Sequence, residues 1–181
     1  PVDVWNIHNM ILDERAGGSG AGIPVGIEAQ AGKYYPKEQQ TNINYFKAHI
    51  VAMRTWMKER GYRDKPLIIS EYGVLESCAF WEGYAPPSCV DRINGYMDAT
   101  FEYMLNATDD EIGYPADGNR LVQRWSWFSL NMPTYEQLPG QGMNGQLCDP
   151  YSNPKQLTAF GEHFESTVNR LMGIGGAVQE P

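Results

Sequence analysis

A short run of branched apolar residues is the feature that most restricts how this chain can fold. Residues 67–69 are Leu-Ile-Ile, and they lead directly into Ser70, Glu71, Tyr72 and Gly73. Continuous apolar runs of this length are typical of strands buried on both faces of a parallel sheet. Parallel α/β folds build their active sites at the carboxyl ends of such strands, so we predict a functional role for Glu71. The alternative is a solvent-exposed glutamate that begins a turn.

Two further segments have the length and pattern of strands. Residues 2–9 read Val-Asp-Val-Trp-Asn-Ile-His-Asn and place His8 at the end of the segment. Residues 120–130 contain Trp125 and Trp127, which share one side of a strand because their positions have the same parity. Helical periodicity over residues 43–60, 91–105 and 157–171 separates or follows these strands. The chain therefore predicts an α/β fold with three parallel strands and flanking helices.

The three predicted strand ends carry a complementary set of side chains. Glu71 supplies a carboxylate, Trp127 an aromatic plate and His8 a polar group. These are the groups that process a glycosidic bond, support the face of a pyranose and bind sugar hydroxyls. Spacing alone does not distinguish a sugar-binding His8 from a hydrogen-bonded histidine of the core.

The order of these motifs resembles one enzyme family, the large clan of retaining glycoside hydrolases with a (β/α)8 barrel. This clan includes cellulases, mannanases and xylosidase-like proteins. DVWNIHN is similar to its sixth strand, KPLIISEYG to its seventh and RWSWFSL to its eighth. The resemblance implies a partial (β/α)8 TIM barrel over residues 1–172, with a tail or linker at residues 173–181.

The resemblance also implies roles for individual residues. Glu71 matches the catalytic nucleophile of a retaining mechanism, and Trp127 matches the tryptophan that stacks beneath the sugar. The remaining expected substrate contacts are His8, Tyr72, Trp125 and Trp81. Trp81 lies in the loop after Glu71, where it either forms a subsite wall or fills the space beneath the loop. The expected activity is hydrolysis of O-glycosidic bonds in a polysaccharide or oligosaccharide.

One part of the family pattern is missing from the chain. The clan carries its general acid/base in an Asn-Glu pair on the fourth strand, and this sequence contains no Asn-Glu pair. A complete barrel needs about 250 residues, whereas this chain has 181. We expect the carboxyl-terminal part of a longer barrel, weak as an enzyme by itself; a small natural partial barrel is the alternative. Candidate acids within the chain are the loop residues Glu14, Glu28 and Glu76.

Two other functional classes remain open. In the first, the chain is a catalytically inactive barrel remnant that still binds glycans. In the second, it is a structural protein that uses an incomplete barrel for assembly. In each case the open sheet edge needs a partner, which is the remainder of the barrel or another chain.

Composition excludes several kinds of partner. The net charge of −8 argues against nucleic-acid binding, and no apolar run approaches the roughly 18 residues of a membrane span. The three histidines lack the paired spacing of a metal site, and no motif indicates a cofactor. We therefore expect a carbohydrate substrate and neither metal nor cofactor.

The cysteines indicate a compartment. Cys78 and Cys89 bracket the loop after Glu71, and we predict a disulfide between them that fixes this loop over the site. Cys148 is left over, and three free thiols are the alternative. A disulfide favours an extracellular or secreted protein.

Overall fold

The computed structural model describes residues 2–27, 32–81, 88–139 and 141–174. Three parallel strands, β1 (Trp5–His8), β2 (Leu67–Tyr72) and β3 (Arg124–Trp127), form one sheet with β2 in the centre. The helices α1 (Ile43–Glu59) and α3 (Cys89–Asn106) connect the strands, and α4 (Ala159–Met172) follows β3. Shorter elements are α2 (Cys78–Trp81) and the 3-10 helices η1 (Lys37–Gln39) and η2 (Pro115–Asp117). The predicted α/β class, with three parallel strands and flanking helices, is confirmed.

The long helices begin at side-chain caps that the sequence supplies. Asn42 accepts a hydrogen bond from the backbone N–H of Asn44, Ser88 caps α3 through Asp91, and Thr158 caps α4. Such caps satisfy backbone donors that the first turn leaves unpaired. α4 ends at Gly173, whose φ of 67° is left-handed and is readily adopted by glycine. The ends of α4 therefore follow directly from local sequence.

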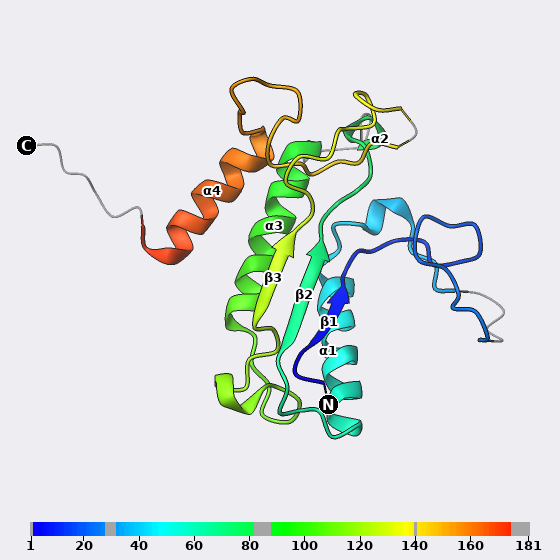
Figure 1. The fold of residues 1–181 in the computed structure, drawn as a ribbon, viewed down its shortest axis with the longest axis vertical. Coiled ribbons are helices and arrows are strands. Elements are labelled where there is room, and N and C mark those ends of the chain that lie inside the picture. Colours follow the sequence, from blue (N-terminus) through cyan, green and yellow to red (C-terminus); the bar gives the residue numbers. More distant parts are fainter. Residues whose placement is uncertain (1, 28–31, 82–87, 140, 175–181) are drawn as a thin grey trace, which may run out of the picture.

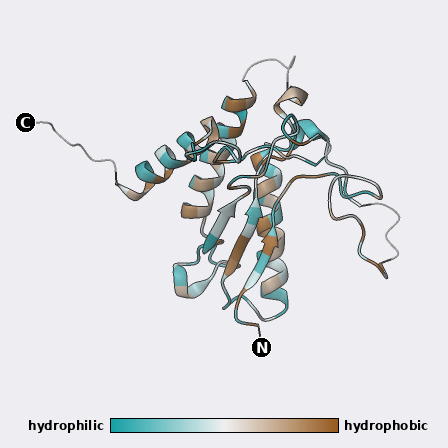
Figure 2. Ribbon diagram, turned by 45° about the horizontal axis from the view of Figure 1, so that its top comes forward, coloured by the Kyte–Doolittle hydropathy of each residue, from teal (hydrophilic) through white to brown (hydrophobic). Residues whose placement is uncertain are grey.

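The helices α1 and α3 lie along the same side of the sheet, which we call the helix-covered face (Figure 1). Leu67, Ile69 and Tyr72 of β2 are completely buried on that side, and Trp5 and Ile7 pack against the same core. Figure 2 shows much of the central strand coloured as hydrophobic, as the Leu-Ile-Ile run predicts, with further hydrophobic segments in β1 and along the helices. We call the opposite side the open face; there, Asn6 Nδ2 donates a hydrogen bond of 2.8 Å to Ser70 Oγ.

The strand register contains an irregularity at the carboxyl end of β2. Ile7 pairs with Ile69 and His8 pairs with Glu71, so the register passes over Ser70. Such a bulge turns two successive side chains to the same face of the sheet. Ser70 and Glu71 therefore both project from the open face, and Tyr72 returns to the helix-covered face.

The amino-terminal end of the sheet is held by a buried arginine. Arg54 lies on α1, within the stripe that we predict to be apolar, and its side chain is fully buried. Its guanidinium donates to the backbone carbonyls of Ile112, Lys65 and Arg63 at 2.8, 2.9 and 3.1 Å. Burial lowers the pKa of Arg54. The arginine thus joins the segments that lead into β2 and β3, at the end of the sheet opposite the candidate site.

Within the described residues, no helix combines the length and the apolarity that crossing a membrane requires. The tail predicted at residues 173–181 lies almost wholly outside the described residues, which end at residue 174.

Candidate functional site

The ends of β1 and β2 bring His8 and Glu71 together on the open face. His8 Nδ1 lies 3.5 Å from Glu71 Oε2, with 58% of the histidine side chain and 42% of the glutamate side chain exposed. The backbone N–H of Asn9 donates to the carbonyl of Glu71 at 2.8 Å and fixes the two strand ends relative to each other. A carboxylate and an imidazole therefore meet where a ligand can reach both.

Trp127 does not join this pair, which corrects its predicted role. It pairs with Tyr72 in the register and lies on the helix-covered face, with 8% of its surface exposed. Its Nε1–H donates to the carbonyl of Gly145 at 2.8 Å, and its ring centroid is 5.2 Å from that of Tyr72. Trp125 and Trp127 do share one side of the strand, as their parity predicts, but that side is the helix-covered face. The bulge at Ser70 places Glu71 on the open face and Tyr72, with Trp127, on the other.

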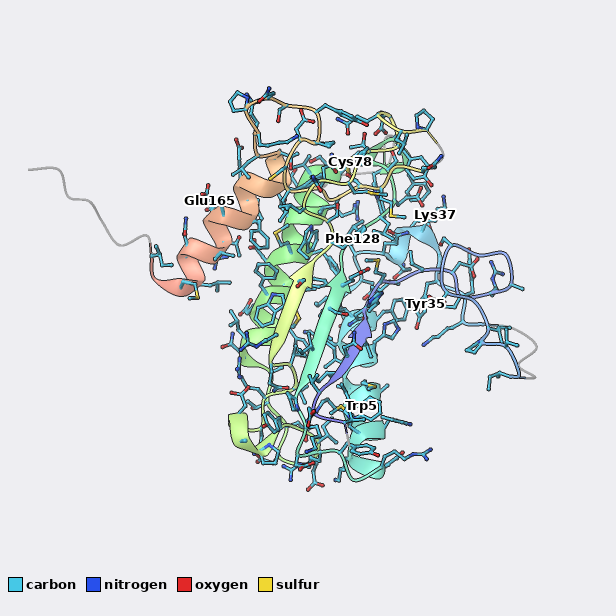
Figure 3. The ribbon with its side chains drawn as sticks, viewed as in Figure 1. Trp5, Tyr35, Lys37, Cys78, Phe128 and Glu165 are labelled. Carbon is cyan, nitrogen blue, oxygen red and sulfur yellow. A yellow bond between two sulfur atoms is a disulfide. The ribbon has the colours of Figure 1, made fainter. Side chains whose placement is uncertain are left out.

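Phe128 is the aromatic residue that the sequence analysis missed. It directly follows Trp127, so strand alternation turns its side chain toward the open face. The side chain is half-buried and is not among the residues packed on the hydrophobic core. Its backbone N–H donates to the carbonyl of Tyr72 at 2.7 Å, and Figure 3 places it at the carboxyl end of β3. The sequence signal for Phe128 is its position directly after Trp127, where a strand residue faces the side opposite to Trp127.

The other predicted aromatic contacts are packing residues. Tyr72 is completely buried, its hydroxyl lies 3.3 Å from Thr100 Oγ1, and burial raises its pKa well above the ordinary value. Trp125 packs against Phe101 of α3 with ring centroids 6.0 Å apart. Trp81 is 5% exposed and contacts Phe80 with its ring. The predicted roles of Tyr72 and Trp81 are therefore corrected, because their rings fill the interior rather than an open sugar site. Trp125 is only partly buried and also lines the apolar groove beside β3, so a substrate contact there stays a prediction.

The two candidate acids that the structure describes, Glu14 and Glu76, form contacts with groups other than Glu71. Glu14 accepts a hydrogen bond from the backbone N–H of Gly22 at 3.2 Å. Glu76 forms an ion pair of 2.9 Å with Lys37, and only 16% of its side chain is exposed. Glu28 lies outside the described residues. Neither of the two described side chains is shown in contact with Glu71.

A further carboxylate, Glu136, lies close to the loop after β2. It accepts a 2.6 Å hydrogen bond from the Ser77 hydroxyl, and this bond lowers its pKa. A general acid needs a raised pKa so that it still carries its proton near neutral pH. Glu136 is therefore poorly suited to protonate a leaving group.

The loop after Glu71 is fastened to three other segments. Cys78 and Cys89 form a disulfide with Cα atoms 5.4 Å apart, while Cys148 is a free cysteine. Gln40 Oε1 accepts from the backbone N–H groups of Leu75 and Glu76, both at 3.2 Å. The Asn144 amide donates to the carbonyl of Glu76 at 3.0 Å. The described part of this loop that follows β2, residues 73–81, is thus held in one position at the carboxyl end of the sheet.

A hydrogen-bonded chain supports the residue that follows His8. Asn9 is completely buried; its amide donates to the carbonyl of Phe46, and its Oδ1 lies 2.8 Å from His49 Nδ1. His49 Nε2 lies 2.8 Å from the Tyr35 hydroxyl. Burial, and next the charge of Lys33, lowers the pKa of His49. A neutral His49 with its proton on Nδ1 satisfies both hydrogen bonds.

Nothing in this geometry assembles a metal centre. Across residues 2–27, 32–81, 88–139 and 141–174, no three His, Cys, Asp or Glu side chains gather to hold a metal ion. Comparison of the chain with models of protein families, with curated proteins and with solved structures finds no match. The function is therefore inferred from the geometry of the site itself.

Proposed function

We propose that this chain is part of a retaining glycoside hydrolase in which Glu71 is the nucleophile. The observation that carries this proposal is the exposed Glu71 carboxylate at the carboxyl end of the central parallel strand, 3.5 Å from His8. Active sites of parallel α/β folds lie at this end of the sheet. The motif resemblance of the three strands supplies the reaction type.

The reaction proceeds by double displacement. A Glu71 oxygen attacks the anomeric carbon while a carboxylic acid about 5–5.5 Å away protonates the departing oxygen. The resulting carboxylate then takes a proton from water, the hydroxide adds to the anomeric carbon, and the bond to Glu71 breaks. His8 orients the Glu71 carboxylate or binds a sugar hydroxyl, and Phe128 offers an apolar plate to the sugar ring.

In this proposal, the general acid and the remaining sides of the substrate site come from outside the described sheet. Within the described residues, β1 and β3 each pair with β2, and the outer edge of each strand remains open. An apolar groove of about 510 Å³ follows the edge of β3 between α3 and α4. Unpaired edges are normally covered in native proteins. These features support a longer barrel whose remaining strands pair here, or another chain in that place.

A second candidate is glycan binding without hydrolysis. It is favoured by the contacts of Glu14 and Glu76, which hold both described candidate acids in their own loops. In either case, the Cys78–Cys89 disulfide supports an extracellular setting.

Covalent trapping distinguishes the two candidates. We would treat the chain with dinitrophenyl 2-deoxy-2-fluoro-glucoside, -mannoside and -xyloside, whose leaving group needs little protonation. The hydrolase proposal expects one of them to add a single glycosyl group, with peptide mapping placing it on Glu71. Glu71→Gln should abolish labelling, whereas Glu102→Gln, an exposed change on α3, should not. Glycan binding with no label from any reagent would favour the second candidate.

A further inference from the structure

A second cavity lies on the same rim as Glu71, beyond the end of β1. Its volume is about 400 Å³, within the size range of ligand pockets, and its walls include Asp13, Arg15, Tyr34, Tyr35, Lys37 and Gln40. Figure 3 places Tyr35 and Lys37 beyond the carboxyl end of β1. Nothing in the proposed chemistry at Glu71 uses these residues.

Direct bonds join this cavity to the loop that follows Glu71. Gln40 is buried, and its Oε1 accepts hydrogen bonds from the backbone N–H groups of Leu75 and Glu76. Lys37 forms an ion pair with the Glu76 carboxylate. Tyr35 connects through His49 to Asn9, the neighbour of His8. The cavity wall is therefore held in a fixed position relative to both strand ends of the candidate site.

The wall contains an aromatic plate that is already immobilised. Tyr34 is 54% exposed, and the Arg15 guanidinium lies 3.9 Å from the centroid of its ring. Asp13 binds that guanidinium through two hydrogen bonds, of 2.9 and 2.8 Å. A side chain that is ordered before binding loses less conformational entropy when a ligand arrives. An exposed, immobilised tyrosine is suited to the apolar face of a sugar ring.

The charges of the wall indicate which kind of sugar fits. Arg15 is paired with Asp13, and Lys37 is paired with Glu76. Glu38 adds a further carboxylate to the lining. Because both lining cations already have carboxylate partners and a further negative charge is present, the wall has little remaining attraction for an anion. It still offers hydrogen-bonding groups to hydroxyls. The ligand that matches is neutral and rich in hydroxyl groups.

We propose that this cavity is a distal subsite that holds one sugar unit of a neutral glycan chain, with Tyr34 as its plate. This inference rests on the proposed function of Glu71 and deepens it. The substrate is a chain of several units that extends from Glu71 to Tyr34, rather than a disaccharide. Affinity therefore increases with chain length until the chain reaches the cavity.

Calorimetric titration of the Glu71→Gln variant tests this proposal, because that variant cannot consume its ligand. The probes are neutral cello-, manno- and xylo-oligosaccharides of two to six units. We expect six-unit chains to bind more tightly than two-unit chains. Adding Tyr34→Ala should weaken the binding of the longest oligosaccharides about tenfold and leave the affinity for the shortest unchanged. Tyr34→Phe should retain the affinity, and Tyr151→Ala, another exposed tyrosine outside the cavity, is the matched control.

Length-independent affinity, or equal weakening of short and long chains by Tyr34→Ala, would overturn the subsite. Tighter binding of an acidic chain, tested with oligogalacturonate, would overturn its neutral character. The two proposals fail separately. Tyr34-dependent binding of long chains without labelling of Glu71 leaves the subsite and removes the hydrolase, and labelling without length dependence does the reverse.

Discussion

His8 Nδ1 and Glu71 Oε2 lie 3.5 Å apart at the carboxyl ends of neighbouring parallel strands. Both side chains are substantially exposed, and exposed pairs of this kind contribute only about 0–1 kcal/mol to stability. Stability alone therefore gives little reason for the pairing. We propose that the pairing instead presents an oriented carboxylate to a ligand.

Replacing His8 with alanine should affect reactivity more than stability. We expect the free energy of unfolding of His8→Ala to fall by less than about 1 kcal/mol, because solvent already screens the pair. Covalent labelling of Glu71 by the fluoroglycosides should slow by about tenfold or more as the carboxylate loses its neighbour. Urea unfolding and labelling kinetics measure the two effects. Unchanged labelling with a large loss of stability would reverse this assignment.

Alanine substitutions of Phe128 and Trp127 should differ in their effects on stability and on glycan binding. Trp127→Ala removes a buried ring and its hydrogen bond to Gly145, so we expect a loss of about 3–5 kcal/mol in the free energy of unfolding. Phe128→Ala removes a ring that lies outside the core, so the loss should be clearly smaller. Phe128→Ala should instead weaken glycan binding in the Glu71→Gln background. A glycan affinity that depends on Trp127 but not on Phe128 would contradict the assigned faces.

Acid should destabilise the protein through His49. Burial lowers the pKa of His49 in the folded protein from its ordinary value of 6.5, so the unfolded chain binds the proton more readily. The stabilisation is present above pH 6.5 and is lost progressively as the pH falls below it. Urea unfolding at pH 7.5 and pH 5 should show this loss.

His49→Gln should reduce the pH dependence over that interval, because glutamine does not titrate. His163→Gln on α4 is the matched control. Equal slopes for the original chain and His49→Gln would exclude His49 as the source.

Removing the Cys78–Cys89 bond should destabilise the chain by about 2–3 kcal/mol, as expected for a bond that joins cysteines 11 positions apart. The double change Cys78→Ser and Cys89→Ser should lower the unfolding midpoint, and Cys148→Ser should leave it nearly unchanged. Thiol counting without reductant should find one thiol in the unfolded chain. Three reactive thiols would refute the disulfide.

Much of the architecture could be predicted because its signals are local. The Leu-Ile-Ile run marked the central strand, and the apolar spacing from Ile43, Ile93 and Phe160 marked the three long helices. The spacing did not reveal Arg54 as a core residue, because its burial depends on carbonyls supplied by distant loops.

The sequence by itself determined which segments become strands and helices, and that Glu71 lies at the carboxyl end of the central strand. Those properties depend on the periodicity and caps of short segments. Only the tertiary structure decided which side chains meet. The bulge at Ser70 arises from pairing with β1 and β3, and it moves Glu71 to the open face while Trp127 remains among the helices. A shift of one residue in register changes the face of a side chain, and no single strand contains the partner that sets its register.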